Sequence, residues 1–159
     1  MAVDFYLKLD TIEGESVRTG FDKQVNLLSF SWGGTQVTAV AGTGGSGAGR
    51  ATLADLTITK YLDKATPKLF KALVAGTHIA NGTLSAVKAG SDVTKPFLTL
   101  TMKEMFITSQ QTSAASEVPV ETVSFSYNEI KLEYFQQDDK GNLTSTGAVT
   151  YNLKVHKLS

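Results

Sequence analysis

Residues 55–67 of the chain read DLTITKYLDKATP, and the hydrophobic pattern changes its period within this stretch. Up to residue 62, the apolar side chains of Leu56, Ile58 and Leu62 alternate with polar ones, which is the period of a half-buried strand. We therefore predict a strand over about residues 51–62. The polar segment that follows ends in Thr66-Pro67, a pair that is typical of the start of a helix.

A short helix is predicted over about residues 66–75. Thr66 is a suitable N-cap, Pro67 fits the first helical position, and Gly76 fits the position just after the last helical residue. An apolar stripe at i, i+4 spacing is expected to bury one side of this helix on a sheet. The stripe consists of Leu69, Phe70, Leu73 and Val74.

Strand-like alternation recurs along the rest of the chain. Further strands are predicted at about residues 3–9, 27–36, 83–88, 97–108, 118–135 and 148–157, and a loop at about 11–24. Within the 118–135 stretch the apolar residues move from odd to even positions, so we expect a bulge or bend near Asn128-Glu129. Strands with one helix and no βαβ rhythm predict a mainly β fold. We expect an antiparallel β-barrel or sandwich of about eight strands with one short flanking α-helix, in a single domain over residues 1–159.

Composition excludes several classes of protein. The chain has 159 residues, and its fifteen basic and fifteen acidic side chains cancel, which gives no electrostatic reason to bind nucleic acid or an anionic membrane. It has no cysteine, so a disulfide scaffold, a cysteine-ligated zinc site and a thiol nucleophile are excluded. Residues 1–10 lack the basic and apolar regions of a secretory signal, and no segment is apolar enough to span a bilayer.

The search for catalytic chemistry finds little. Gly42, Gly44 and Gly47 match the dinucleotide-binding pattern, but that motif needs a helix next, and here a strand-like pattern follows. The two histidines, His78 and His156, have no carboxylate at metal-ligand spacing and are expected to have structural or solvent-facing roles. We therefore predict no catalytic, cofactor-binding or metal-binding site.

Hydroxyl side chains recur at two-residue spacing, so that each pair shares one face of a predicted strand. These pairs are Ser29/Ser31, Thr57/Thr59, Thr99/Thr101 and Ser124/Ser126. The pattern has two interpretations: ordinary β-propensity on a solvent-facing surface, or a smooth, weakly charged surface that lines a channel.

The chain resembles the Hcp family (haemolysin-coregulated protein), the tube proteins of the bacterial type VI secretion system, nearly from end to end. The most specific match is residues 55–67. The others, in chain order, are residues 2–4, 12–16, 28–33 (LSFSWG), 42–50 (GTGGSGAGR), 76–78, 88–90 and 123–126. Residues 136–148 and the C-terminus match less well.

This resemblance implies a β-barrel with a flanking helix that assembles into a homohexameric ring. The rings stack into a tube inside a contractile sheath, and the tube carries a VgrG spike protein at its tip and effectors in its lumen. The protein would be cytoplasmic during assembly and then reach the medium or a target cell without a signal peptide. Two alternatives remain open: a phage-tail-like tube protein, and a small secreted enzyme or binding module.

The resemblance also suggests particular residues. Its second-strand motif contributes to the channel wall, which makes Ser31, and after it Ser29, the candidates for contact with cargo. The glycine segment 42–50 pays a large entropy cost on ordering, which a contact between subunits would recover. Its candidate assembly residues are Gly42, Gly44, Gly45, Gly47, Gly49 and Arg50.

Overall fold

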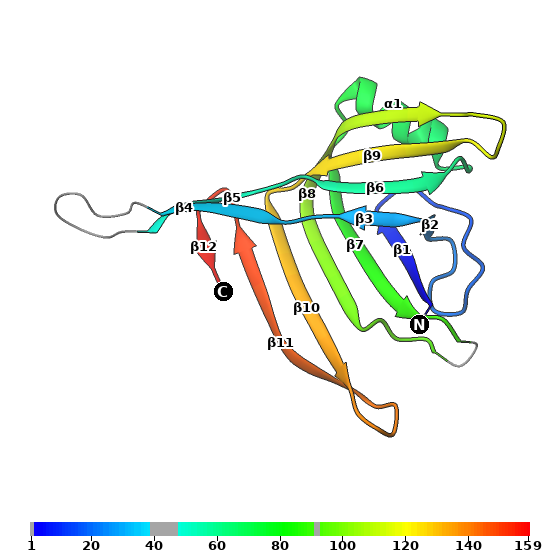
Figure 1. Cartoon of the computed structure of the whole chain (residues 1–159). Helices are drawn as coiled ribbons and strands as arrows, with labels where there is room; N and C mark the ends of the chain where they lie inside the picture. The colour runs from blue at the N-terminus through cyan, green and yellow to red at the C-terminus, as the bar shows by residue number, and fades with distance from the viewer. Residues whose placement is uncertain (1, 39–47, 91–92) are drawn as a thin grey trace.

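Two layers of antiparallel strands make up most of the computed structural model, which describes residues 2–38, 48–90 and 93–159 (Figure 1). We call the larger one layer one. Its strands, in spatial order, are β12 (Lys157–Leu158), β11 (Leu143–Asn152), β10 (Glu129–Gln137), the first half of β8 (Leu98–Ser113), β7 (Ile79–Lys88), β1 (Val3–Leu9) and β2 (Val25–Leu27).

Layer two shares strand β8 with layer one. Its strands, in spatial order, are the second half of β8, β9 (Val120–Ser126), β6 (Leu56–Tyr61) and β3 (Ser29–Ser31). The shared strand changes layers near Glu104, whose φ of 53° lies in the left-handed region. The strands of layer two run across those of layer one (Figure 1), and the two layers form a sandwich that does not close into a barrel.

The hydrophobic core lies between the two layers, as the alternation of apolar residues predicts. Inward-facing side chains of both layers form one cluster; among its fully buried members are Leu7, Leu84, Leu100, Met102, Leu56, Ile58, Val123 and Phe125. Burial of this apolar surface is the main favourable contribution to folding. The outer faces of the strands do not take part in this core and are available for contacts with other molecules.

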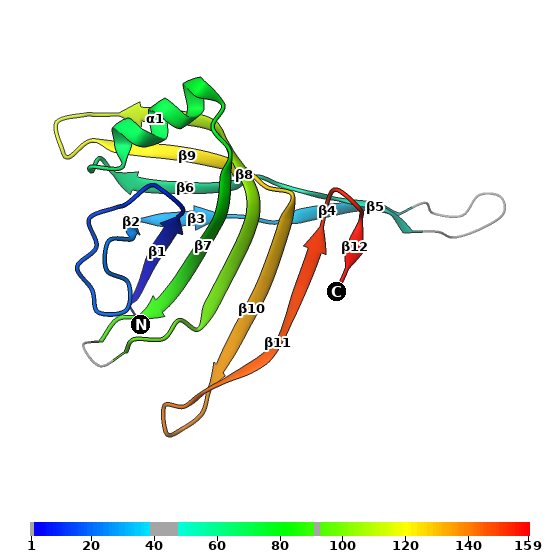
Figure 2. The same ribbon diagram turned by 180° about the vertical axis from the view of Figure 1, so that it is seen from behind.

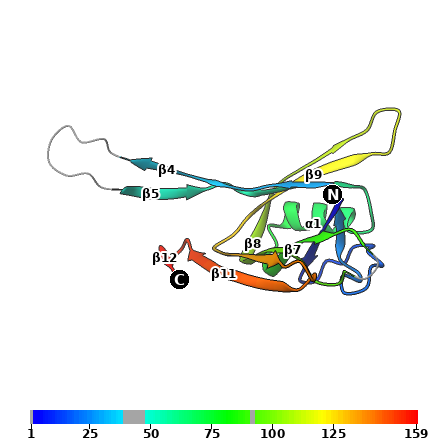
Figure 3. The same ribbon diagram turned by 60° about the horizontal axis from the view of Figure 1, so that its bottom comes forward.

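Helix α1 (Thr66–Ala75) lies between the two layers, toward one end of the sandwich (Figure 3). Its predicted extent and its C-terminal cap are confirmed, since Gly76 is left-handed with a φ of 64°. The predicted N-cap is wrong: Ala65 occupies that position, and the Thr66 hydroxyl instead accepts a hydrogen bond from the Asp63 amide.

The predicted apolar stripe of α1 is only half right. Leu69 is buried and Leu73 packs against the core, but Phe70 and Val74 are 59% and 71% exposed. Ala72 takes their place on the buried side, because spacings of three and four residues both return to one helix face.

A two-stranded arm projects away from the sandwich (Figures 1 and 2). It consists of β4 (Gly34–Thr38) and β5 (Ala48–Leu53), which pair with each other. The arm corrects two predictions. Residues 27–36 form three short strands instead of one, and Gly49 and Arg50, expected in a loop, belong to β5.

The other strand predictions are largely confirmed, although the described residues hold twelve strands instead of about eight. The 118–135 stretch bends at residues 127–128, where the chain passes from layer two to layer one. The last predicted strand ends early, at Asn152, because residues 153–156 form turns that lead into β12.

The inner face of layer two also holds a buried ion pair between Lys60 and Glu121. Burial by itself raises the pKa of Glu121, but hydrogen bonds from Lys60, Gln110 and Thr66 and the charge of Lys60 together hold that pKa below its ordinary value of 4.5. The ionised form of Glu121 is therefore the one that the fold favours.

This pKa shift predicts an acid-dependent loss of stability. A carboxylate whose pKa is lowered by folding contributes stability above its unfolded pKa and loses that contribution as the pH falls. Between about pH 7 and about pH 3, we expect the free energy of unfolding, measured with urea, to fall more for the native chain than for the Glu121→Gln variant. Only the native chain has a carboxylate at this position to protonate. A stability difference between the two chains that does not change with pH would contradict this expectation.

Trp32 is expected to stabilise the fold, because it is half-buried against the core and its Nε1 donates a 2.6 Å hydrogen bond to the Tyr127 hydroxyl. Trp32→Ala should lower the free energy of unfolding by about 2–4 kcal/mol, which corresponds to a loss of about 5–15 °C in Tm for a chain of this size. Trp32→Phe keeps most of the apolar contact and should cost about 1 kcal/mol. Thermal melts of both variants test this, and equal melting temperatures would mean that the side chain is not part of the core.

Candidate lining and assembly surfaces

The outer face of layer two carries rows of uncharged hydrogen-bonding side chains. Cross-strand register places them side by side. One row consists of Ser31, Thr57, Ser124 and Ser109, and the next consists of Ser29, Thr59, Thr122 and Gln111. We call these two rows the hydroxyl face.

Alternation along the strands explains why this face is polar. Phe30, Ile58 and Val123 point into the core, so the residues on either side of them point outward. Thr57 Oγ1 and Ser124 Oγ lie 3.0 Å apart and hydrogen bond to each other, while Ser31 and Ser29 at the edge strand are exposed. The face therefore offers hydroxyl and amide groups to a neighbour, without a formal charge in either row.

The structure brings together most of the predicted hydroxyl pairs. Ser29/Ser31, Thr57/Thr59 and Ser124 share the hydroxyl face, whereas Ser126 opposes Phe106 and lies outside its two rows. Thr99/Thr101 lie in layer one, where Glu133 and Lys131 are their cross-strand neighbours. Sequence reasoning missed three members: Thr122, Ser109 and Gln111. Thr122 has the same parity as Ser124 and could have been found from it, but Ser109 follows a register shift after Ile107 that the alternation does not indicate.

The projecting arm is the second candidate surface. Within the described residues, neither outer edge of the arm pairs with another strand, and unpaired edges are templates for pairing with another chain. Gly49 is required here, because a Cβ at this position would lie 2.5 Å from the carbonyl oxygen of Val37. Gly49 and Arg50 are both exposed. Among the candidate assembly residues, Gly42, Gly44, Gly45 and Gly47 lie outside the described residues.

An apolar groove of about 320 Å³ lies at the base of the arm. It is lined by Trp32, Ala51, Leu53, Ile130, Leu132, Val149, Tyr151 and Leu158. Val149 and Leu158 are 53% and 68% exposed, although they are apolar. An exposed apolar groove is a candidate site of protein–protein contact.

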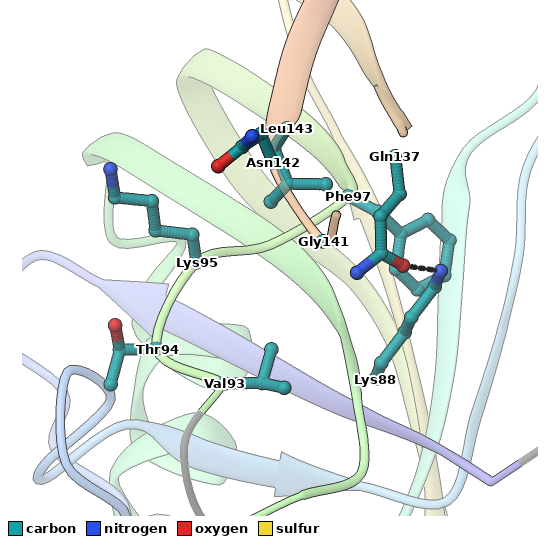
Figure 4. Close-up of a pocket in the computed structure, with 9 residues that line it drawn as sticks. All are labelled: Lys88, Val93, Thr94, Lys95, Phe97, Gln137, Gly141, Asn142 and Leu143. Atoms are coloured by element: carbon teal, nitrogen blue, oxygen red, sulfur yellow. Dashed lines mark hydrogen bonds between the residues drawn. The ribbon is translucent and has the colours of Figure 1, made fainter. Parts of the chain in front are cut away.

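A polar hollow of about 310 Å³ lies between the loop before β8 and the β10–β11 turn (Figure 4). Lys88 Nζ donates a hydrogen bond to Gln137 Oε1 across it, and Lys95 and Asn142 also line it. Among the described residues, none that lines the hollow is a carboxylate or a histidine, the groups that general acid–base chemistry most often uses.

Neither histidine belongs to the two rows of the hydroxyl face or to the arm. The His78 ring packs 5.3 Å from the Phe106 ring, and His156 lies in a turn where its Nδ1 is 3.4 Å from the Tyr151 hydroxyl. In the part of the chain that the structure describes, no three His, Cys, Asp or Glu side chains gather closely enough to hold a metal ion. Helix α1 is too short and too polar to cross a bilayer.

An open β-sandwich with unpaired strand edges, an exposed apolar groove and an uncharged outer face has the features of a structural protein that self-associates. Comparison with known proteins shows the family of this chain. The family model described as "Type VI secretion system effector, Hcp" matches residues 6–134. Protein hcp1 of Pseudomonas aeruginosa is 31% identical over 159 residues, which cover 99% of this chain and 98% of that relative.

Solved structures agree with this match. One described as a type six secretion system protein has a TM-score of 0.91 and 30% identity, and the alignment covers 99% of this chain and all of the other. Hcp1 from Salmonella typhimurium has a TM-score of 0.80 and 28% identity over the full length of both chains. The chain belongs to the Hcp family and is a type VI secretion tube protein. Proteins of this family are structural, self-associating and secreted.

Proposed function

We propose that this chain forms homohexameric rings that stack into the inner tube of a type VI secretion system, with the hydroxyl face toward the lumen. The whole chain, residues 1–159, acts as one domain with no catalytic site, cofactor or metal. The tube carries a VgrG spike protein, lies in a contractile sheath and takes effectors in its lumen. It assembles in the cytoplasm and is then secreted.

The observation that carries this proposal is the uncharged hydroxyl face. A lumen that passes folded cargo needs a surface that neither binds apolar patches tightly nor repels one sign of charge. Hydroxyl groups meet both requirements, because they are uncharged and can both donate and accept hydrogen bonds. The exposed apolar groove supports the ring, since burying it against a second copy removes it from water. A heterologous contact gives a ring with cyclic symmetry when the rotation between successive copies closes.

Native mass measurement tests the ring. At micromolar concentration we expect a species of about six times the mass of the chain, because the resemblance to the Hcp family implies a homohexamer and a closed ring has cyclic symmetry. A protein that stays monomeric at every concentration would contradict the ring, whatever its lumen surface carries.

The second test concerns cargo at Ser31, an exposed edge position of the hydroxyl face. Ser31→Gln adds bulk without charge, so we expect the ring to form normally while the export or cellular stability of at least one lumen-carried effector falls. Ser29→Gln is expected to have a smaller effect.

A matched control separates this effect from a general one. Thr144→Gln makes the same kind of change at an exposed position of β11 in layer one. It should leave both ring assembly and effector export unchanged. Equal export by native, Ser31→Gln and Thr144→Gln proteins would remove Ser31 from the cargo contact.

A further inference from the structure

The ion pair between Lys60 and Glu121 is the only cross-strand pair of charges on the inner face of layer two in the described residues. The two residues oppose each other on β6 and β9, and both side chains are fully buried. Lys60 Nζ donates hydrogen bonds to Glu121 Oε1, to the Tyr61 carbonyl oxygen at 2.9 Å and to Asp63 Oδ1 at 2.9 Å. The pair lies directly behind the hydroxyl face.

Further hydrogen bonds connect this pair to two other elements. The Thr66 hydroxyl, in the first turn of α1, donates to Glu121 Oε1 at 2.8 Å, and Gln110 Nε2, on β8, donates to Glu121 Oε2 at 2.7 Å. Asp63 Oδ1 also accepts from the Ala65 amide at 2.9 Å. The cluster therefore joins β6, β9, β8 and the start of the helix at one point.

Alternation alone leaves the pairing of β6 with β9 ambiguous. A slip of one residue would turn the hydroxyl face into the core, which is strongly unfavourable. A slip of two residues keeps apolar side chains inward and hydroxyl groups outward, because both strands repeat the same pattern over Leu56, Ile58, Val123 and Phe125. The apolar core and the hydroxyl face therefore discriminate poorly between these registers.

The ion pair removes this ambiguity. In either two-residue slip, Lys60 and Glu121 no longer oppose each other. Lys60 keeps Asp63, three residues further along its own chain, but Glu121 is left buried without a cation. A buried charge without a partner is strongly unfavourable. A correctly paired one adds little net stability over an apolar pair, so discrimination between registers is the effect that it supplies.

We propose that Lys60 and Glu121 are positioning residues: their buried pair selects the native register of β6 on β9 and, through Thr66, fixes the start of α1 to that register. This accounts for two charged residues of the 55–67 segment, Lys60 and Asp63, which hydrogen bond to each other. The inference concerns pairing within one subunit, so it stands or falls independently of the ring and of cargo.

Cysteine cross-linking reads the register directly, because the chain has no cysteine of its own. Thr57→Cys with Ser124→Cys places two thiols at directly opposed positions and reports the native register. Thr57→Cys with Thr122→Cys reports a two-residue slip, because diagonal neighbours at about 7–8 Å are too far apart for a disulfide. The disulfide fraction of each full-length protein is measured by mass spectrometry.

The test compares these reporters in a background without the ion pair, Lys60→Met with Glu121→Gln, in which Asp63 keeps its hydrogen bond from the Ala65 amide. The amide introduced at position 121 can still hydrogen bond to Thr66 and Gln110, so mainly the charges are lost. We expect the background to remain folded and the slipped cross-link to rise at least about tenfold over the otherwise native chain, because the unpaired-charge penalty is gone.

The matched control is the same double change at an exposed pair, Lys64→Met with Glu13→Gln, whose Nζ and Oε2 atoms lie 3.8 Å apart. It should leave both cross-links at native levels. A slipped cross-link that stays at the native level in the Lys60/Glu121 background would overturn the proposal. Failure of that background to fold would also overturn it, since the charges would then supply stability instead of register.

Discussion

Truncation of Phe125 to alanine is expected to lower the free energy of unfolding by about 3–5 kcal/mol, the usual loss for a fully buried phenylalanine. Phe125 is completely buried in β9 and packs in the cluster between the two layers. For a chain of this length the loss corresponds to a fall of about 6–20 °C in Tm. Thermal and urea unfolding of the purified variant measure it.

The control for Phe125→Ala is the same substitution at Phe70. That side chain is 59% exposed on the outer side of α1, so its removal should change the free energy of unfolding by no more than about 0.5 kcal/mol. If the two variants lost equal stability, either Phe70 would be covered in solution or Phe125 would not belong to the core.

Replacement of the arm is expected to abolish assembly while the sandwich remains folded. Residues 36–51 can be replaced by Asn-Gly, because Thr35 and Thr52 oppose each other and a two-residue turn of this type joins antiparallel strands. The arm pairs with no strand of the sandwich in the described residues, so the melting temperature should change little. Electron microscopy and native mass should show the loss of ring or tube contacts.

A comparable deletion elsewhere provides the control. The β10–β11 turn can be shortened to Asn-Gly between Gln137 and Leu143, which also oppose each other. This variant should assemble normally. If the chain without the arm still formed tubes, the glycine segment and the strands that carry it would be only a connection between layers.

Sequence analysis predicted correctly those elements whose local sequence pattern is compatible with only one backbone conformation. Gly76 ends α1 because few other residues adopt its left-handed conformation at no cost. The change of parity near Asn128 forces a bend, since both sets of apolar residues must face the same core. Local chemistry is sufficient in both places.

The errors arise where a strand's partner matters more than its own pattern. Residues 27–36 alternate as one strand, yet they divide among layer one, layer two and the arm because each part pairs with a different neighbour. Phe70 and Leu69 are equally apolar, and only the position of the sheet determines that Leu69 is the buried one. Pairing partners far apart in the chain are not encoded in local periodicity.

The hydroxyl face was likewise predictable in part, from local pattern, and in part depended on strand pairing. Its Ser29/Ser31 and Thr57/Thr59 pairs could be predicted as outward-facing from parity, but their assembly into rows required the register between four strands. Lys60 could also have been identified, because it falls on the apolar parity of its strand together with Leu56 and Ile58. A charged residue at a core position indicates a buried partner of opposite charge.

Strand β8 has a mechanical consequence. Its first half is hydrogen bonded between β7 and β10, and its second half pairs with β9, so one continuous backbone belongs to both layers. A tensile or compressive load on either layer is therefore transmitted to the other through covalent bonds as well as side-chain packing. We expect amide hydrogens on both sides of Glu104 to exchange with solvent in a single cooperative opening, with the protection of the slowest-exchanging core. A subunit with this property resists shear between its layers as one stiff body.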